Sequence, residues 1–115
     1  MINCKQKGNR AERDVAKIIN KTLNTNLKRT PQSGGMDFKG DLIDTNLNSV
    51  AHQFSWEIKD RKTLRINDWW EQAVNDCPTN KIPTLTFKLN AHFFTMIRLE
   101  DFLGLLKSIE EKGVK

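Results

Sequence analysis

The chain has few of the residues that build a zinc site or a disulfide framework. Its only cysteines are Cys4 and Cys77, and its only histidines are His52 and His92. Two distant cysteines make neither a zinc site nor a disulfide framework. Neither histidine has the spacing of a metal ligand. We therefore expect two free thiols, the second at the end of a helix, and two histidines in ordinary strand or loop positions.

Long hydrophobic runs are also missing. No apolar run approaches the ~20 residues of a membrane-spanning helix, and residues 1–10 lack the apolar centre of a secretory signal. Internal repeats, low-complexity tracts and linkers are absent too. The 115 residues, of which 37% are hydrophobic, predict a single domain over 1–115 with one modest core. We expect a soluble, cytoplasmic protein without a membrane partner.

Basic residues outnumber acidic ones. The 19 Lys and Arg against 14 Asp and Glu give a net charge of +5 and a pI near 9.4. This balance favours a polyanionic partner such as nucleic acid. A solvated positive surface would give the same composition, so the charge alone does not decide between the two.

The spacing of apolar residues predicts a mixture of helices and strands. Helices are expected over 5–23, 67–76 and 99–112, and strands over 27–30, 40–44, 50–59, 84–89 and 92–97. The order helix, three strands, helix, two strands, helix indicates an α/β fold with a central sheet flanked by helices. The glycine-rich loop over 31–35 lacks the spacing of a P-loop, which argues against nucleotide binding.

The strand around Glu57 carries an acid and a base on one face. Side chains alternate along a strand, so Glu57 and Lys59 point one way and Trp56 and Ile58 the other. The apolar pair can anchor the strand in the core. The charged pair then needs a chemical reason to stand together.

Two further acids complete a candidate metal site. Asp41 opens the strand expected to pair with this one, and Glu12 lies beside the apolar stripe of the first helix. Magnesium in proteins is held by one or two carboxylates, waters and substrate phosphates. It acts as a Lewis acid and lowers the pKa of bound water, while a nearby lysine can steer that water. The sequence therefore predicts a magnesium-dependent nuclease site, in which Mn²⁺ would substitute for Mg²⁺.

In this scheme Asp41, Glu57 and the backbone carbonyl of Ile58 bind the metal, and Lys59 positions or deprotonates the water. Glu12 has two interpretations: it binds a second metal or orients a metal-bound water, or it is a boundary residue paired with a lysine one turn away. Asp37 and Asp44 compete with Asp41 for its role. Asp41 is favoured because it precedes the apolar pair at 42–43.

These residues resemble the PD-(D/E)XK nuclease superfamily, and within it the small Holliday junction resolvases of archaeal type and their phage relatives. The likeness runs from about residue 7 to residue 73 and rests on Lys7-Gly8, Glu12, Arg29, Ser33-Gly34, Gly40-Asp41, Trp56-Glu57-Ile58-Lys59 and Gln72-Ala73. One position departs from the pattern, because Gly40 stands where the motif has proline.

The resemblance implies a restriction-endonuclease-like αβββαββα core with a mixed five-stranded sheet. It also implies metal ligation by Asp41 and Glu57, catalysis by Lys59, and a supporting role for Glu12. Members usually act as homodimers in DNA recombination, and a phage protein would act in the host cytoplasm. The expected DNA contacts are Arg10, Arg13, Lys28, Arg29, Ser33, Lys39, Arg61, Lys62 and Gln72.

The predicted function is a structure-selective endonuclease that resolves Holliday junctions or other branched DNA. Two alternatives remain: a nickase or restriction-type endonuclease on duplex DNA, and a DNA-binding module of the same fold that no longer cuts. The homodimer would bury one tryptophan of the pair at 69–70 or the phenylalanine pair at 93–94.

Overall fold

The computed structural model describes residues 4–30, 40–44, 46 and 48–113, with residues 4–6 described by their backbone only. The elements occur in the predicted order of one helix, three strands, one helix, two strands and one helix. They are α1 (Cys4–Leu23), β1 (Leu27–Arg29), β2 (Leu42–Asp44), β3 (Phe54–Lys59), α2 (Ile66–Asn75), β4 (Ile82–Leu89), β5 (His92–Met96) and α3 (Leu99–Glu111).

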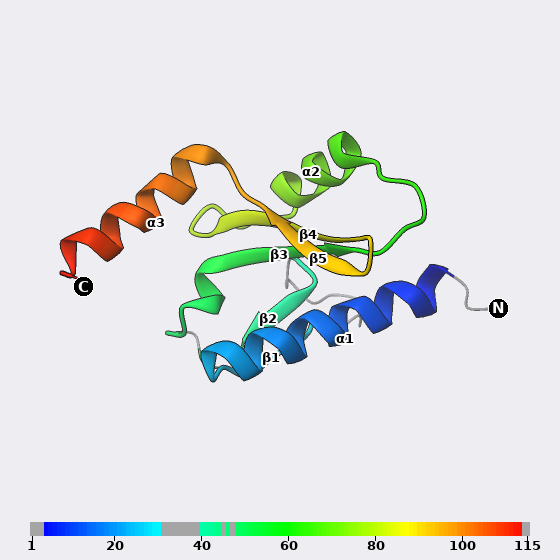
Figure 1. Ribbon diagram of the computed structural model, residues 1–115, viewed down its shortest axis with the longest axis horizontal. Coiled ribbons are helices and arrows are strands. Elements are labelled where there is room, and N and C mark those ends of the chain that lie inside the picture. The colour runs from blue at the N-terminus through cyan, green and yellow to red at the C-terminus, as the bar shows by residue number, and fades with distance from the viewer. Residues whose placement is uncertain (1–3, 31–39, 45, 47, 114–115) are drawn as a thin grey trace.

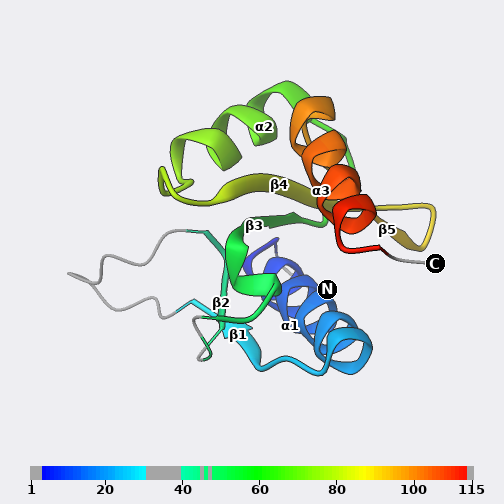
Figure 2. The same ribbon diagram turned by 90° about the vertical axis from the view of Figure 1, so that its left-hand side faces the viewer.

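The five strands form one mixed sheet in the order β1-β2-β3-β4-β5. Neighbouring strands are antiparallel except β3 and β4, which are parallel and are connected through α2. In the two views, α1 lies on one face of the sheet and α2 on the other (Figures 1 and 2). The predicted α/β fold, with a central mixed sheet flanked by helices, is confirmed.

The main core lies between α1 and the sheet. The apolar stripe of α1 packs there against buried side chains of β1, β2 and β3, and the buried members are Ala11, Val15, Ala16, Leu27, Leu42, Ala51 and Ile58. Trp56 packs against this cluster and donates its indole N–H to the carbonyl of Ala51 at 3.0 Å. Trp56 and Ile58 therefore anchor β3 from the α1 face, as the alternation predicted.

The opposite face of β3 and β4 is covered by α2. Trp69 and Ala73 are the buried residues of this helix, and Leu85 on β4 has no exposed surface. Of the two adjacent tryptophans, Trp69 is the core residue and Trp70 is half-buried. Since α2 contacts β3, the face that carries Glu57 is covered as well.

Three of the five predicted strand starts are wrong, and two strands end one residue early, at Arg29 and Met96. The strand expected from residue 50 begins at Phe54, because 51–53 form a short 3-10 helix after the turn that Asp44 closes. The strand expected from residue 40 begins at Leu42, and Asp41 therefore lies just before it. The fourth strand begins at Ile82 rather than at residue 84, because it pairs with β3 from Phe54 onward.

The last helix extends away from the sheet (Figure 1). Five of its six large apolar residues are exposed, namely Leu99, Phe102, Leu103, Leu106 and Ile109, and Leu105 is half-buried. Among the described residues, no helix is long and apolar enough to cross a membrane.

Candidate active site

Asp41 is fixed by backbone hydrogen bonds on both sides. Its N–H donates to the carbonyl of Trp56 at 2.6 Å, and its own carbonyl accepts the N–H of Thr30 at 2.9 Å. The preceding Gly40 has a φ of +81°. Proline, whose φ is locked near −65°, cannot adopt that conformation. The departure from the superfamily pattern at this position therefore has a conformational reason.

The side chain of Asp41 reaches the neighbouring strand. Its Oδ2 accepts the backbone N–H of Ile58 at 2.6 Å. In a strand, the N–H and the C=O of one residue point toward the same neighbour. The carbonyl of Ile58 therefore faces the side of Asp41, as a shared metal site would require.

Glu57 and Lys59 lie on the same face of β3. Glu57 is only 3% exposed, and its Oε2 lies 3.4 Å from Nζ of Lys59. The carboxylate is thus buried under α2 with one cation beside it. Burial of a charge is unfavourable unless the charge is paired. Here the positive charge of Lys59 acts on both Glu57 and Asp41 and lowers the pKa of each.

The two carboxyl groups have strongly raised pKa values. Burial is the main cause for both: the pKa of Glu57 rises to about 7 and that of Asp41 to about 6. Repulsion from Asp41 raises the pKa of Glu57 further, and Glu12 does the same to Asp41. The hydrogen bond from Ile58 to Asp41 and the charge of Lys59 act in the opposite direction. A cation at this position would remove the repulsion.

Sequence reasoning missed one acid. Asp76 lies at the carboxyl end of α2, and its charge raises the pKa of both Asp41 and Glu57. No local pattern marked it, because its approach depends on how α2 packs across β3 and β4. It adds negative potential to the place where a metal would bind.

Glu12 lies on α1 and is hydrogen-bonded to Arg29 on β1. Its Oε1 accepts from Nε of Arg29 at 2.8 Å, and a terminal nitrogen of Arg29 donates to Oδ1 of Asn9 at 2.7 Å. The partner of Glu12 is therefore an arginine from another element, not a lysine one turn away on its own helix. Its charge acts on Asp41 but is not among the groups that act on Glu57.

The two competitors of Asp41 are placed differently. Asp44 is 1% exposed and accepts the N–H of Asn46 at 2.7 Å and the hydroxyl of Ser49 at 2.6 Å. Burial raises its pKa, but these hydrogen bonds, one from the backbone of Asn26 and the charge of His52 together outweigh burial, and the net pKa is lowered. Asp44 therefore closes the turn after β2. Asp37 lies outside the described residues.

The predicted DNA contacts fall into separate regions. Arg13, Lys28 and Arg29 line a groove between α1 and β1. Arg61 and Lys62 line hollows after β3, where Lys7 forms an ion pair with Asp60 at 3.6 Å. Two more of the predicted side chains, Arg10 and Gln72, are exposed on α1 and α2. Ser33 and Lys39 lie outside the described residues.

The donor set fits a hard cation. Among the described residues, no group of three His, Cys, Asp or Glu side chains gathers as a complete metal cage. Magnesium needs no such cage, since it keeps several waters and takes one or two carboxylates from the protein. Asp41, Glu57 and the carbonyl of Ile58 are donors of that kind. The charge of Lys59 does not offset burial and repulsion, since the pKa values of both carboxyl groups stay raised.

A mixed sheet between two layers of helices, with an acid before β2 and an acid and a lysine on β3, defines the PD-(D/E)XK nuclease superfamily. A family model described as "Phage putative PDDEXK endonuclease" matches residues 3–113, and the chain belongs to that family. No curated protein and no solved structure matches the chain.

Proposed function

We propose that the protein is a metal-dependent DNA endonuclease that cuts branched DNA, with four-way junctions as the preferred substrate. The observation that carries this proposal is a pair of carboxyl groups with raised pKa values beside Lys59, namely the buried Glu57 and the half-buried Asp41. Two acids in such surroundings persist most readily where a divalent cation offsets their charge. Membership in a family of phage endonucleases supports the same chemistry.

Asp41, Glu57 and the carbonyl of Ile58 would hold Mg²⁺, or Mn²⁺ in its place. The bound ion would supply a Lewis acid and a water of lowered pKa. Lys59 orients that water and offsets negative charge on the phosphate, because its Nζ stands 3.4 Å from Glu57 at the same end of β3. Glu12 supports Asp41 from the α1 side and holds Arg29 toward the substrate.

The described elements support a substrate recognised by shape. Apart from α3 and the short 3-10 helix over 51–53, they all belong to the sheet and its two covering helices, so the described residues include no inserted element to read base edges. The basic side chains on both sides of the site suit phosphates, which carry no sequence information. The 115 residues act in this proposal as one nuclease domain.

A homodimer would place two sites on opposed strands of a junction. The structure changes which aromatic residues are available for the interface. Trp69 is buried, Phe93 packs against the core, and Phe94 is exposed and stacks on Phe87. Of the pair Phe93 and Phe94, Phe94 is therefore the residue we favour for the interface. A monomer in sedimentation at micromolar concentration would contradict the homodimer.

The decisive experiment compares labelled four-way junctions, flaps and linear duplexes of equal sequence with Mg²⁺ present. We expect the junction to be cut fastest, and Lys59→Ala and Asp41→Asn to bind junctions but not cut them. Equal cutting by Lys59→Ala would contradict the mechanism. Equal cutting of linear duplex would favour a nickase or restriction-type enzyme. Absence of Mg²⁺ and Mn²⁺ binding in calorimetry would favour a DNA-binding module that does not cut.

A further inference from the structure

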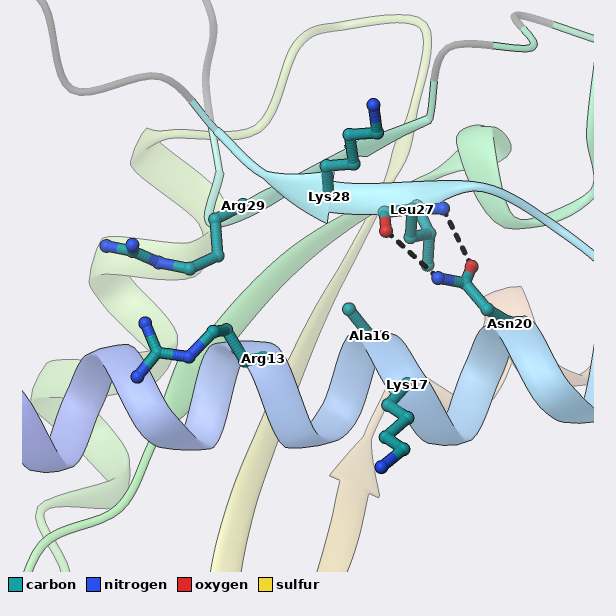
Figure 3. Close-up of a pocket in the computed structure, with 7 residues that line it drawn as sticks. All are labelled: Arg13, Ala16, Lys17, Asn20, Leu27, Lys28 and Arg29. Atoms are coloured by element: carbon teal, nitrogen blue, oxygen red, sulfur yellow. Dashed lines mark hydrogen bonds between the residues drawn. The ribbon is translucent and has the colours of Figure 1, made fainter.

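A groove of about 470 Å³ runs between α1 and β1, beside the candidate active site. Its lining consists of Arg13, Ala16, Lys17, Asn20, Leu27, Lys28 and Arg29. Figure 3 shows Ala16 and Leu27 pointing toward each other across the groove, with both arginine guanidinium groups at one end. The floor is thus apolar and the sides are cationic.

Asn20 closes the other end and fixes the width of the groove. Its Nδ2 donates to the carbonyl of Leu27 at 3.0 Å, and its Oδ1 accepts the N–H of Leu27 at 2.7 Å and the hydroxyl of Thr25 at 2.8 Å (Figure 3). This side chain thereby pairs with the outer edge of β1. These hydrogen bonds tie α1 to the strand at this end of the groove.

Three of its four cations are available to a ligand. Arg29 is held by Glu12 and Asn9. Arg13, Lys17 and Lys28 are exposed, and within the described part of the chain none of them forms an ion pair. In Figure 3, Lys28 extends from β1 away from α1 and Lys17 extends from α1 away from β1, so their ammonium groups lie along the outer sides of the groove.

The backbone of β1 adds a donor to the same side. The N–H and C=O of Leu27 face Asn20, whereas the N–H of Thr30 faces Asp41. Since backbone groups alternate between the two edges of a strand, the N–H of Arg29 points to the groove.

The dimensions suit a short piece of DNA backbone. Arg13 and Asn20 are seven residues apart on α1, which is about 10 Å along the helix axis. In a duplex one strand carries a phosphate per roughly 3.4 Å of axis, and an unpaired strand can be more extended, so the groove takes at most about three phosphates. The apolar floor of Ala16 and Leu27 suits the carbon face of deoxyribose rather than another charged group.

We propose that this groove binds the sugar–phosphate backbone of a single DNA strand leading away from the catalytic carboxylates. Arg29 joins the two regions, because it lines the groove and also contacts Glu12. The proposal rests on the proposed function and deepens it: the preferred substrate has an unpaired strand next to the cut, as branched DNA does when its arms open.

The test measures binding without metal and without cutting. Fluorescence anisotropy with EDTA would follow a labelled single-stranded 12-mer and the matching duplex from 50 to 300 mM salt. The variant K17A/K28A removes two groove cations, and K107A/K112A removes two exposed lysines from and just after α3 as a charge-matched control. Thermal unfolding of both variants verifies that they are folded.

We expect K17A/K28A to bind the single strand about ten-fold more weakly at 100 mM salt, with a salt slope lower by roughly 1.4 for two lost contacts. The control should bind like the parent. An unchanged slope, an equal loss in K107A/K112A, or a loss seen only with duplex would overturn the proposal. If the groove proposal is wrong and the proposed function is right, K17A/K28A will bind and cut DNA like the parent protein. If the proposed function is wrong, the parent protein will not cut branched DNA, while K17A/K28A will still bind the single strand more weakly than the parent.

Discussion

The Oδ2 atom of Asp41 accepts the backbone N–H of Ile58 at 2.6 Å. The acid that precedes β2 is therefore fixed to the strand segment between Glu57 and Lys59. A slip of one residue between β2 and β3 would turn Glu57 and Lys59 to the other face of the sheet. This hydrogen bond links the register of the two strands to the assembly of the site, and it allows fold and chemistry to be tested separately.

Asp41→Asn and Asp44→Asn should have opposite effects. Asparagine at position 41 keeps an oxygen for the N–H of Ile58 and removes a charge that burial disfavours. Cutting should be lost, with an unchanged or higher melting temperature at pH 8. Asparagine at position 44 replaces one of two oxygens that accept hydrogen bonds, from Asn46 and Ser49. We expect a loss of about 1–3 kcal/mol in the free energy of unfolding.

The readouts are calorimetric unfolding and cutting at a temperature where both variants are folded. Asp44→Asn should cut at the parental rate under those conditions. The assignment of the two acids would be reversed if Asp44→Asn folded normally but did not cut.

Stability should fall as pH rises from about 4 to about 7. The pKa values of Asp41 and Glu57 are about 6 and about 7 in the folded chain, against 3.8 and 4.5 for the same groups when unperturbed. The folded state therefore binds more protons than the unfolded state in this window, and the free energy of unfolding decreases with pH. Asp44, whose pKa is lowered, acts in the opposite direction at more acidic pH.

Magnesium should reverse this loss. At pH 8 both carboxylates are ionised, and added Mg²⁺ should raise the melting temperature. At pH 5 protons compete for the same oxygens, so the rise should be smaller. Chelation should restore the metal-free value, and Glu57→Gln should reduce both the pH dependence and the metal effect. An equal effect of Mg²⁺ at pH 5 and pH 8 would contradict binding at these two acids.

Gly40→Ala should be destabilising, and Gly104→Ala should not. Gly40 has a φ of +81°, and an added Cβ would lie 3.1 Å from Oγ of Ser55 and 3.3 Å from the carbonyl oxygen of Trp56. Strain of this kind costs about 1–3 kcal/mol. Gly104 lies inside α3 with nothing near an added Cβ, so alanine there should stabilise by roughly 0.5–1 kcal/mol. Chemical denaturation of the two variants gives the comparison.

Much of the fold was predictable because its signals are local. The apolar stripe of α1 and the alternation of Trp56 and Ile58 against Glu57 and Lys59 follow from helix and strand periods alone. The same periods gave the order of elements and brought the acids toward one sheet. The boundaries near Gly40 and Ala51 were wrong, because a positive φ and a 3-10 helix with Ala51 buried are set by contacts with β3.

The electrostatics of the site were not predictable in the same way. Strand alternation placed Glu57 and Lys59 on one face, but it could not show that α2 covers this face, where burial raises the pKa of Glu57. Asp76 is far in sequence from the two acids whose pKa values it raises. Glu12 and Arg29, which are in contact, are also far apart in sequence. Such relationships depend on how helices pack on the sheet, and no pattern in the chain encodes them locally.

Glu12→Gln separates a role in catalysis from a role in holding Arg29. Glutamine keeps an oxygen that can accept from Nε of Arg29, so the contact seen at 2.8 Å can persist and the fold should be unaffected. The change removes a negative charge that acts on Asp41, and the pKa of Asp41 should fall. If Glu12 supports the metal-binding acid, cutting at low Mg²⁺ should decrease by about 10–100-fold with DNA binding retained.

Single-turnover cutting across a Mg²⁺ titration would measure this effect, with Asp14→Asn as the control, since Asp14 is exposed on the same helix. Arg29→Met, which removes the partner and leaves the acid, should weaken DNA binding in the groove as well as cutting. Parental cutting by Glu12→Gln at every Mg²⁺ concentration, together with weaker DNA binding by Arg29→Met, would limit Glu12 to positioning the arginine.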